Sequence, residues 1–266
     1  MEAVSRLIEI IEQIAGGNYS NDIMPLTTED QPEAVRTIAE AVGMMMVKIE
    51  AREYELEMMV EELKALNRKI KENTIKTVSA MAYALAARDV YTEGHAERVG
   101  ELSGRMARHM GLDEESVEHV RIGGILHDIG KIGFSDVLFQ AHEGRTPPEL
   151  VAEIVRHPGA GVEILRDLDF LGPALDYVHS HHERLDGKGY PRSLKADGIS
   201  LGARILAVAD SFDAITTDRP YQKGRAPEVA LGILKGLAGK KLDESCVAAL
   251  EAVLKEKGTP ISVERG

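Results

Sequence analysis

The sequence contains little cysteine, few aromatic residues and no long apolar run. Its 266 residues include one cysteine, Cys246, no tryptophan, and aromatic residues at 4%. A single cysteine excludes an intrachain disulfide and a cysteine-rich zinc site. No apolar stretch approaches the roughly 18 residues that a membrane-spanning helix needs, and the N-terminus lacks a signal-peptide pattern. We therefore expect a protein without a membrane span, located in the cytoplasm.

Basic residues are also in deficit. The chain has 32 Lys and Arg against 44 Asp and Glu, which gives a formal net charge of −12 at pH 7. A nucleic-acid polymer binds clustered positive charge, so this balance argues against such a partner, whereas a small anionic ligand needs only local positive charge. Hydrophobic residues make up 44% of the chain, enough to bury a core. The lack of long alternating β-branched runs predicts an all-α fold.

The N-terminal region has the pattern of a helical module. The apolar set Val4, Leu7, Ile8, Ile11 and Ile14 predicts a helix that ends at Gly16-Gly17-Asn18. An extended link over residues 19–26 and a second helix from near Glu33 should follow. Along that second helix an apolar heptad repeats, with Val42, Ile49, Leu56, Leu63 and Ile70 at its first position and Met45, Met59 and Leu66 at its fourth.

The heptad predicts a parallel coiled-coil homodimer, because an apolar seam of this length needs a partner helix. The alternative is one long amphipathic helix that folds back on its own domain. The order of helix, connector, helix and coiled coil resembles a HAMP signalling module, here without the usual membrane helices.

The residues suited to catalysis lie further along the chain. All nine histidines fall between His95 and His182. The adjacent pair His127-Asp128 can bind one metal ion through nitrogen while its carboxylate bridges to a second. Lys131 follows three residues after Asp128, so on a helix it lies near the same face and can reach a ligand held by the metal. Taken alone, the pair also fits a structural hydrogen bond, and Lys131 fits a solvated surface lysine.

Two longer strings extend this pattern. Residues 181–191 read His-His-Glu-x-x-Asp-Gly-x-Gly-Tyr-Pro, and residues 210–221 read Asp-x-Phe-Asp-Ala-x-Thr-x-x-Arg-Pro-Tyr. Together with His127-Asp128, these strings resemble the HD-GYP family of HD phosphohydrolases, from near Thr77 to near Leu254. The resemblance implies hydrolysis of cyclic di-GMP to linear pGpG, to GMP or to both, by attack of a hydroxide that bridges metal ions.

The resemblance also implies a set of metal ligands. These fall on His95, His127, Asp128, His157, His181, His182 and Asp210, with Asp128 as the bridge. One ion would take His95, His127 and Asp210, and the other His157, His181 and His182. Family members with a third ion carry Glu where this chain has Tyr91, so we expect two ions. Histidine and carboxylate without thiolate suit iron, manganese, nickel or zinc better than magnesium. Among these metals, the resemblance implies iron or manganese, with nickel or zinc as alternatives.

We expect Asp128 and Lys131 to act in catalysis, with the ammonium of Lys131 on a non-bridging phosphate oxygen. The residues expected to contact the substrate are Lys131, Arg184, Lys188, Gly189, Tyr190, Pro191, Arg219 and Lys223. Arg184, Lys188 and Arg219 could instead be surface charges. Tyr190 would stack on guanine or fix its loop, and the same loop is a candidate surface for a signalling partner. Asp213 fits a structural or supporting carboxylate.

Three domains follow from these patterns: a HAMP-like module over 1–55, a coiled-coil linker helix over 56–78 and an HD-GYP domain over 79–258. The leading hypothesis is a metal-dependent cyclic di-GMP phosphodiesterase. The alternatives are a catalytically weak cyclic-dinucleotide receptor or signalling scaffold, an enzyme for another cyclic dinucleotide, and a generic nucleotidase. Binding of cyclic di-GMP without product, in the presence of iron or manganese, would favour the receptor.

Overall fold

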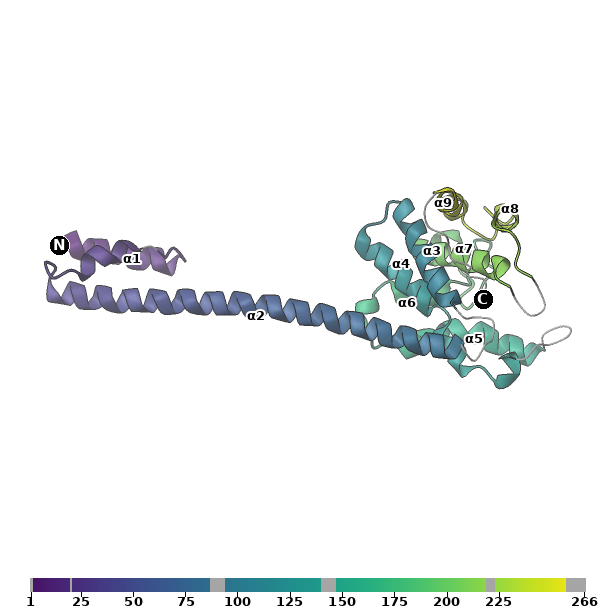
Figure 1. Cartoon of the computed structure of the whole chain (residues 1–266), viewed down its shortest axis with the longest axis horizontal. Helices are drawn as coiled ribbons and strands as arrows, with labels where there is room; N and C mark the ends of the chain where they lie inside the picture. The colour runs from purple at the N-terminus through teal and green to yellow at the C-terminus, as the bar shows by residue number, and fades with distance from the viewer. Residues whose placement is uncertain (1, 20, 87–93, 140–146, 219–222, 257–266) are drawn as a thin grey trace. The chain divides into compact units, whose positions relative to one another are not determined.

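The computed structural model describes all residues except 1, 20, 87–93, 140–146, 219–222 and 257–266 (Figure 1). The described residues form helices and turns with two isolated β-bridges and no strand, so the expected all-α class is confirmed. The chain divides into two compact units, Met1–Glu72 and Asn73–Gly266. Among the described helices, none has both the length and the apolar character required to cross a membrane.

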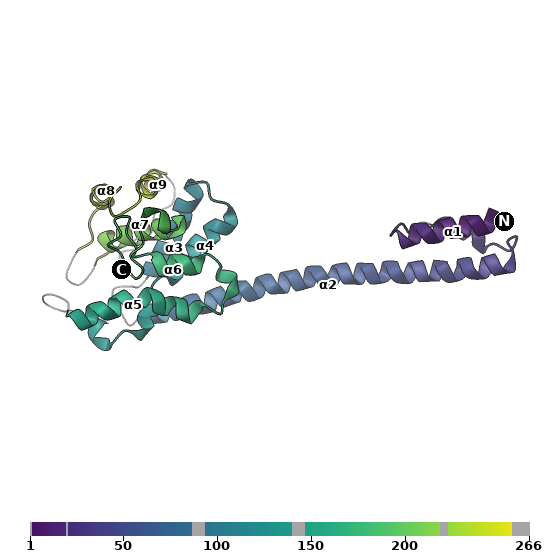
Figure 2. The same cartoon turned by 180° about the vertical axis from the view of Figure 1, so that it is seen from behind.

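The first unit is built on helix α1 (Glu2–Ala15), the 3-10 helix η1 (Asn21–Thr27) and the beginning of α2 (Glu33–Ala86). Helix α1 lies along the first part of α2 in both views (Figures 1 and 2). The small core of this unit contains Leu7, Ile10, Ile14, Ile23, Leu26, Val35, Ala39, Val42 and Met46. Helix α2 runs without a break through the residues of the predicted heptad, so the long second helix was predicted correctly.

The sequence analysis expected an extended link between these helices, and this prediction is wrong. Residues 21–27 form a 3-10 helix that includes Pro25. In a 3-10 helix, side chains three residues apart lie on the same side, and Ile23 and Leu26 are both buried against the helices. The hydroxyl of Thr27 donates to the carbonyl of Met24 over 2.8 Å, which closes the turn.

The predicted apolar faces are only partly buried. In α1, Leu7 and Ile14 are buried as expected, but Val4, Ile8 and Ile11 are 48%, 53% and 37% exposed. A helix that packs on one neighbour covers one face only, and these three side chains lie on another. On α2, the heptad residues Leu56, Met59, Leu63, Leu66 and Ile70 are each more than half exposed.

The second unit is a bundle of helices around two apolar clusters. After the end of α2 its elements are α3 (His95–His109), α4 (Glu114–Leu126), η2 (Ile129–Gly133), η3 (Asp136–Phe139), α5 (Pro148–Leu165), η4 (Asp169–Leu171), α6 (Ala174–Ser180), η5 (Ala196–Gly198), α7 (Leu201–Thr216), α8 (Pro227–Lys235) and α9 (Glu244–Lys255). One cluster joins α3, α4, α7, α8 and α9, and the other joins α4, α5, α6 and Ala82 of α2. Helix α4 contributes to both clusters and so fixes the two halves of the bundle together.

Cys246 lies in the first of these clusters and is fully buried. Burial raises the pKa of its thiol to about 12, so the side chain is an unreactive packing residue. This agrees with the sequence, in which no second cysteine offers a partner.

Candidate metal centre

The seven candidate metal ligands lie mostly at the ends of helices. Helix α3 begins at His95, α4 ends one residue before His127, and α6 ends one residue before His181. His157 lies within α5 and Asp210 within α7. Helix ends can approach a common point more closely than helix middles, because fewer side chains surround them. The fold thereby brings together residues that are up to 115 positions apart in the sequence.

The sequence analysis placed His127 and Asp128 on one helix, but the structure does not. Helix α4 ends at Leu126, His127 is its C-cap residue, and Asp128 precedes the 3-10 turn η2. Asp128 has φ −99° and ψ 4°, a conformation outside the α-helix. The change in direction after His127 lets the Asp128 carboxylate lie between two groups of histidines.

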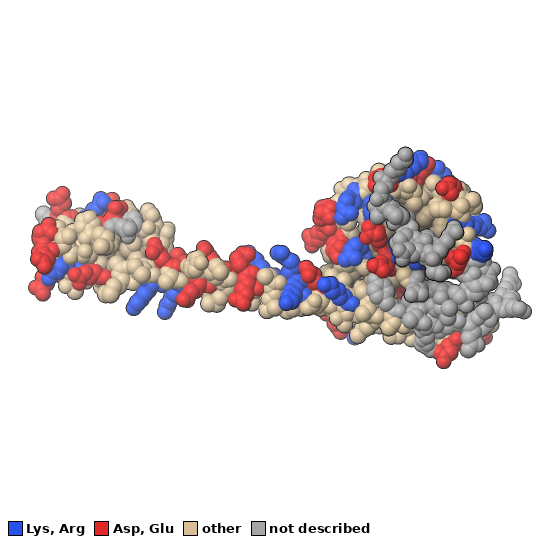
Figure 3. All heavy atoms as spheres, viewed as in Figure 1, with Lys and Arg blue, Asp and Glu red and all other residues tan. Residues whose placement is uncertain are grey.

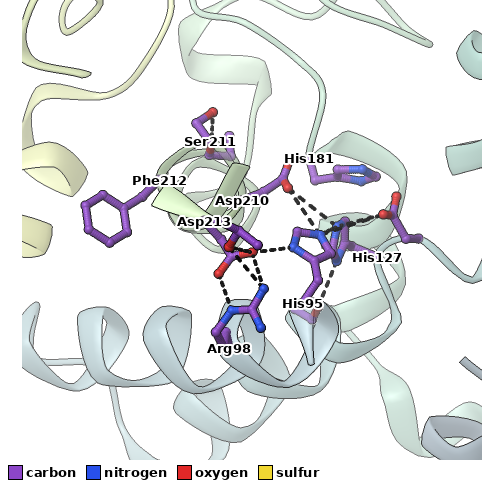
Figure 4. Close-up of polar contacts among 12 residues, drawn as sticks. His95, Arg98, His127, His181, Asp210, Ser211, Phe212 and Asp213 are labelled. Atoms are coloured by element: carbon purple, nitrogen blue, oxygen red, sulfur yellow. Dashed lines mark hydrogen bonds and ion pairs between the residues drawn. The ribbon is translucent and has the colours of Figure 1, made fainter. Parts of the chain in front are cut away.

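The first group consists of His95, His127, Asp128 and Asp210. Figure 4 labels His95, His127 and Asp210. The Nε2 atoms of His95 and His127 are 3.3 Å apart. His95 Nε2 lies 3.5 Å from Asp210 Oδ1, and His127 Nε2 lies 3.4 Å from Asp128 Oδ2. Four side chains from three segments therefore present nitrogen and oxygen atoms to one small volume, as a metal site requires.

The second group consists of Asp128, His157, His181 and His182, whose ligand atoms all lie within 4.8 Å of one another. His157 Nε2 is 3.4 Å from Asp128 Oδ1 and 3.4 Å from His181 Nε2. The rings of His181 and His182 are 4.0 Å apart between centroids. Asp128 belongs to both groups, with Oδ2 toward the first and Oδ1 toward the second.

Three of the histidines are oriented by their own helices. The Nδ1 atoms of His127, His157 and His181 lie 2.8, 2.6 and 2.7 Å from the carbonyl oxygens three residues earlier, those of Gly124, Ile154 and Val178. A carbonyl only accepts hydrogen bonds, so each Nδ1 donates its hydrogen to the helix, and in the neutral imidazole the lone pair is on Nε2. Each of these Nε2 atoms therefore faces the centre as the atom that would bind a metal.

The polar atoms of the centre fit a cation. Asp128 Oδ1 is buried and accepts no hydrogen bond from any described residue. Burial disfavours charge on His127, but the carboxylates of Asp128 and Asp210 outweigh it and raise the pKa of His127 to about 9. A divalent ion at this position would coordinate the unsatisfied oxygen and balance the negative charge of the two acids.

Two further histidines, His181 and His182, are held neutral. Burial lowers the pKa of His182 to about 4. Burial also lowers the pKa of His181 well below its usual value, and neighbouring histidines, His182 first, lower it further. Both imidazoles are therefore neutral near pH 7, and neutral imidazole is the form that binds metal ions.

The expected substrate residues are distributed unevenly around the centre. Lys131 lies beside it, with Nζ 2.5 Å from Asp128 Oδ2. Arg184 makes a two-point ion pair with Asp186 inside its own loop. Lys188 and Lys223 are exposed. Arg219 lies outside the described residues, as does Tyr91, on which the expectation of two ions rather than three depends.

The loop with Gly189, Tyr190 and Pro191 borders the second group. The Tyr190 ring lies 4.7 Å from the His182 ring and 6.4 Å from the His157 ring, between centroids. A Cβ atom at Gly189 would lie 2.5 Å from the backbone nitrogen of Arg184, so only glycine lets the two parts of the loop approach this closely. Tyr190 thereby packs on His182.

Three residues that support the centre were missed or left undefined by the sequence analysis. Glu183 is 3% exposed, and its carboxylate accepts the backbone N–H groups of Arg192 at 2.6 Å and Leu194 at 2.9 Å. It therefore holds the loop that carries Tyr190. Behind His95, the buried Asp213 pairs with Arg98, whose side chain is 22% exposed. The sequence did offer a signal for two of them. Asp213 follows Asp210, and Arg98 follows His95, by three residues, which is about one helical turn.

The HD domain family matches residues 79–246 of this chain. A cyclic di-GMP phosphodiesterase response regulator, RpfG, from Xanthomonas campestris is 36% identical over 183 residues, which are 68% of this chain and 48% of the relative. A cyclic di-GMP phosphodiesterase from Thermotoga maritima is 41% identical over 172 residues, 64% of this chain and 46% of the relative. A 3'3'-cGAMP-specific phosphodiesterase 3 from Vibrio cholerae is 33% identical over 177 residues, 66% of this chain and 38% of the relative. The chain thus spans less than half the length of each of these relatives.

Proposed function

The chain belongs to the HD domain family, in its HD-GYP branch, and we propose that it is a metal-dependent phosphodiesterase that hydrolyses cyclic di-GMP to linear pGpG, GMP or both. The names of two relatives, at 36% and 41% identity, support this substrate. The observation that carries the proposal is the pair of histidine groups that share Asp128. Two cation positions joined by one carboxylate suit the hydrolysis of a phosphodiester.

The two positions are proposed to hold divalent ions. One would be bound by His95, His127 and Asp210, the other by His157, His181 and His182, with Asp128 shared between them. The donors are imidazole and carboxylate without thiolate, which suit iron, manganese, nickel or zinc. Among these metals, membership of the HD-GYP branch supports iron or manganese. When bound, such ions would neutralise phosphate charge and activate water for attack on phosphorus.

The surrounding side chains have distinct tasks in this proposal. The Lys131 ammonium, at the edge of the centre, contacts a non-bridging phosphate oxygen and offsets charge that develops during hydrolysis. The Tyr190 ring, packed on His182, forms one wall for the substrate. Glu183 keeps that wall in place through the loop backbone. The tip of the loop, at exposed Lys188, is the surface that we assign to a signalling partner.

A further part of the proposal concerns the N-terminal unit. We propose a HAMP-like module over 1–55, a coiled-coil linker over 56–78 and the catalytic domain over 79–258, with the linker joining two copies of the chain in parallel. The exposed stripe Leu56, Met59, Leu63, Leu66 and Ile70 supports this, because its spacing of three and four residues is that of a coiled-coil seam. On the face seen in Figure 3, charged side chains of both signs alternate with uncharged ones along α2.

Placing charge in the seam should separate the copies. The double substitution Leu56→Lys and Leu63→Lys is expected to convert a dimer into a single chain of 29.0 kDa, measured by light scattering after gel filtration. The control places two lysines outside the seam, through Glu57→Lys and Glu61→Lys, which changes the net charge by four instead of two, and it should remain dimeric. A dimer that survives in the first variant would contradict the proposed interface.

Metal content and turnover measured on one sample test the catalytic proposal. After anaerobic purification, we expect about two iron or manganese ions per chain and release of pGpG or GMP from cyclic di-GMP. Chelation should abolish turnover, and Mn²⁺ or Fe²⁺ should restore it. Binding of cyclic di-GMP to the metal-loaded protein without product would instead indicate a receptor. Faster hydrolysis of 3'3'-cGAMP would assign the substrate class of the Vibrio cholerae relative.

A further inference from the structure

His95 differs from the other ligand histidines in how it is oriented. His127, His157 and His181 use carbonyl groups of the preceding helical turn. His95 is the first residue of α3, so its own helix has no preceding turn to offer. Its Nδ1 instead lies 2.7 Å from Oδ2 of Asp213, 118 residues later on α7. Since a carboxylate only accepts hydrogen bonds, His95 also carries its hydrogen on Nδ1 and directs Nε2 toward the centre.

Asp213 is itself fixed from both helices (Figure 4). Arg98, one turn after His95 on α3, donates from Nε to Asp213 Oδ1 at 2.6 Å and from Nη2 to Oδ2 at 3.0 Å. Thr217, next to the end of α7, donates from its hydroxyl to Oδ2 at 3.2 Å. Asp213 is only 6% exposed, so its position is set by these partners rather than by water. In Figure 4 its carboxylate lies between Arg98 and His95.

We propose that Asp213, held by Arg98, is the positioning residue for His95 and controls binding at one metal position only, the one formed by His95, His127 and Asp210 with Asp128. A carboxylate behind a ligand imidazole fixes its orientation and makes the metal-binding nitrogen more basic. At the other position, His157 and His181 are oriented by carbonyl groups of their own helices and need no such acid. This inference rests on the metal centre proposed above.

The test counts Mn²⁺ per chain by equilibrium dialysis and elemental analysis, and records the electron paramagnetic resonance of the bound ions. The wild type should bind two ions with a spin-coupled signal. Asp213→Leu removes the acceptor and should weaken the affinity for one of the two ions by about 10- to 100-fold, so that one tightly bound ion with an uncoupled signal remains. Asp213→Asn retains one acceptor oxygen for His95, and its affinity for that ion should lie between those of the wild type and Asp213→Leu.

A matched control comes from a second arginine–aspartate pair away from the centre. Arg204 Nη1 lies 3.1 Å from Asp243 Oδ2, where α7 meets the start of α9. Asp243→Asn should lower thermal stability and still bind two ions. If Asp213→Leu does not fold, Arg98→Met provides the test. It removes the side chain that holds Asp213 and leaves the contact between His95 and Asp213, so it should weaken the affinity for the same single ion.

Two results would overturn the inference: two ions bound with unchanged affinity in folded Asp213→Leu or Arg98→Met, or simultaneous loss of both ions in either folded variant. Both results leave the proposed metal centre intact if the wild type binds two ions. A wild type that binds no Mn²⁺ would contradict the metal centre, and the inference with it.

Discussion

Asp128→Asn is expected to lower the hydrolysis of cyclic di-GMP by about a thousandfold or more. Asp128 belongs to both groups of candidate ligands, so its carboxylate is the link between the two proposed ions. Paired ions supply several kcal/mol of transition-state stabilisation, and about 1.4 kcal/mol corresponds to a factor of ten in rate. Although burial opposes it, the charges of His127 and Lys131 hold the pKa of Asp128 well below its usual value, so the group is ionised at neutral pH.

The same variant should remain folded. Asparagine has nearly the volume of aspartate, and the Lys131 side chain is 28% exposed, so its ammonium can turn to water when its acidic partner is lost. Turnover, bound metal and the thermal melt are measured together. Asp167→Asn, at a side chain that is 93% exposed, provides the matched control and should change none of the three. Wild-type turnover with unchanged metal content in Asp128→Asn would contradict the shared-carboxylate arrangement.

The sequence was informative where chemistry restricts residue type. The two strings at 181–191 and 210–221, with the pair at 127–128, contain five of the seven candidate ligands, and the family resemblance implied the other two, His95 and His157. The fold places all seven in two adjoining groups. The all-α class was also predictable, because few segments alternate with a period of two. These inferences depend on local patterns that survive without knowledge of packing.

Packing was harder to predict because it depends on the neighbour. Five apolar residues of α1 were expected to form one face, yet the neighbour covers Leu7, Ile10 and Ile14 and leaves Val4, Ile8 and Ile11 open. A period of 3.6 residues does not indicate which of two apolar faces is covered. The 3-10 helix over 21–27 was not predicted for a related reason. It depends on the burial of Ile23 and Leu26 against the neighbouring helices, which the sequence does not show.

The supporting residues were the least predictable part of the centre. The contact between His95 and Asp213 joins positions 118 residues apart, and nothing in either motif states that the second acid faces away from the metal position. The reason is that α3 begins at His95, so His95 has no preceding helical carbonyl of the kind that His127 and His181 use. Secondary-structure boundaries, which patterns locate poorly, therefore decide this feature.

Gly130→Ala should damage both stability and turnover, because the turn that carries Lys131 passes directly over α5. A Cβ atom at Gly130 would collide with the carbonyl oxygen of His157, and would lie 2.6 Å from the backbone nitrogen of Gly161. Both are backbone atoms of a helix, so neither can move aside as a flexible side chain could. Overpacking of this kind costs about 1–3 kcal/mol, which lowers the melting temperature of a domain this size by roughly 2–12 °C.

The expected loss of turnover is larger than the loss of stability suggests. The collision pushes η2, with Asp128 at its start, away from the helix that carries His157, and so separates the two groups of ligands. A misplacement of about 1 Å at a catalytic group costs about a hundredfold in rate. Gly133→Ala is the matched control, because a Cβ there meets nothing within 4 Å, and it should leave melting temperature and turnover unchanged. If Gly130→Ala behaves like Gly133→Ala in both measurements, the close contact between η2 and α5 does not hold the centre together.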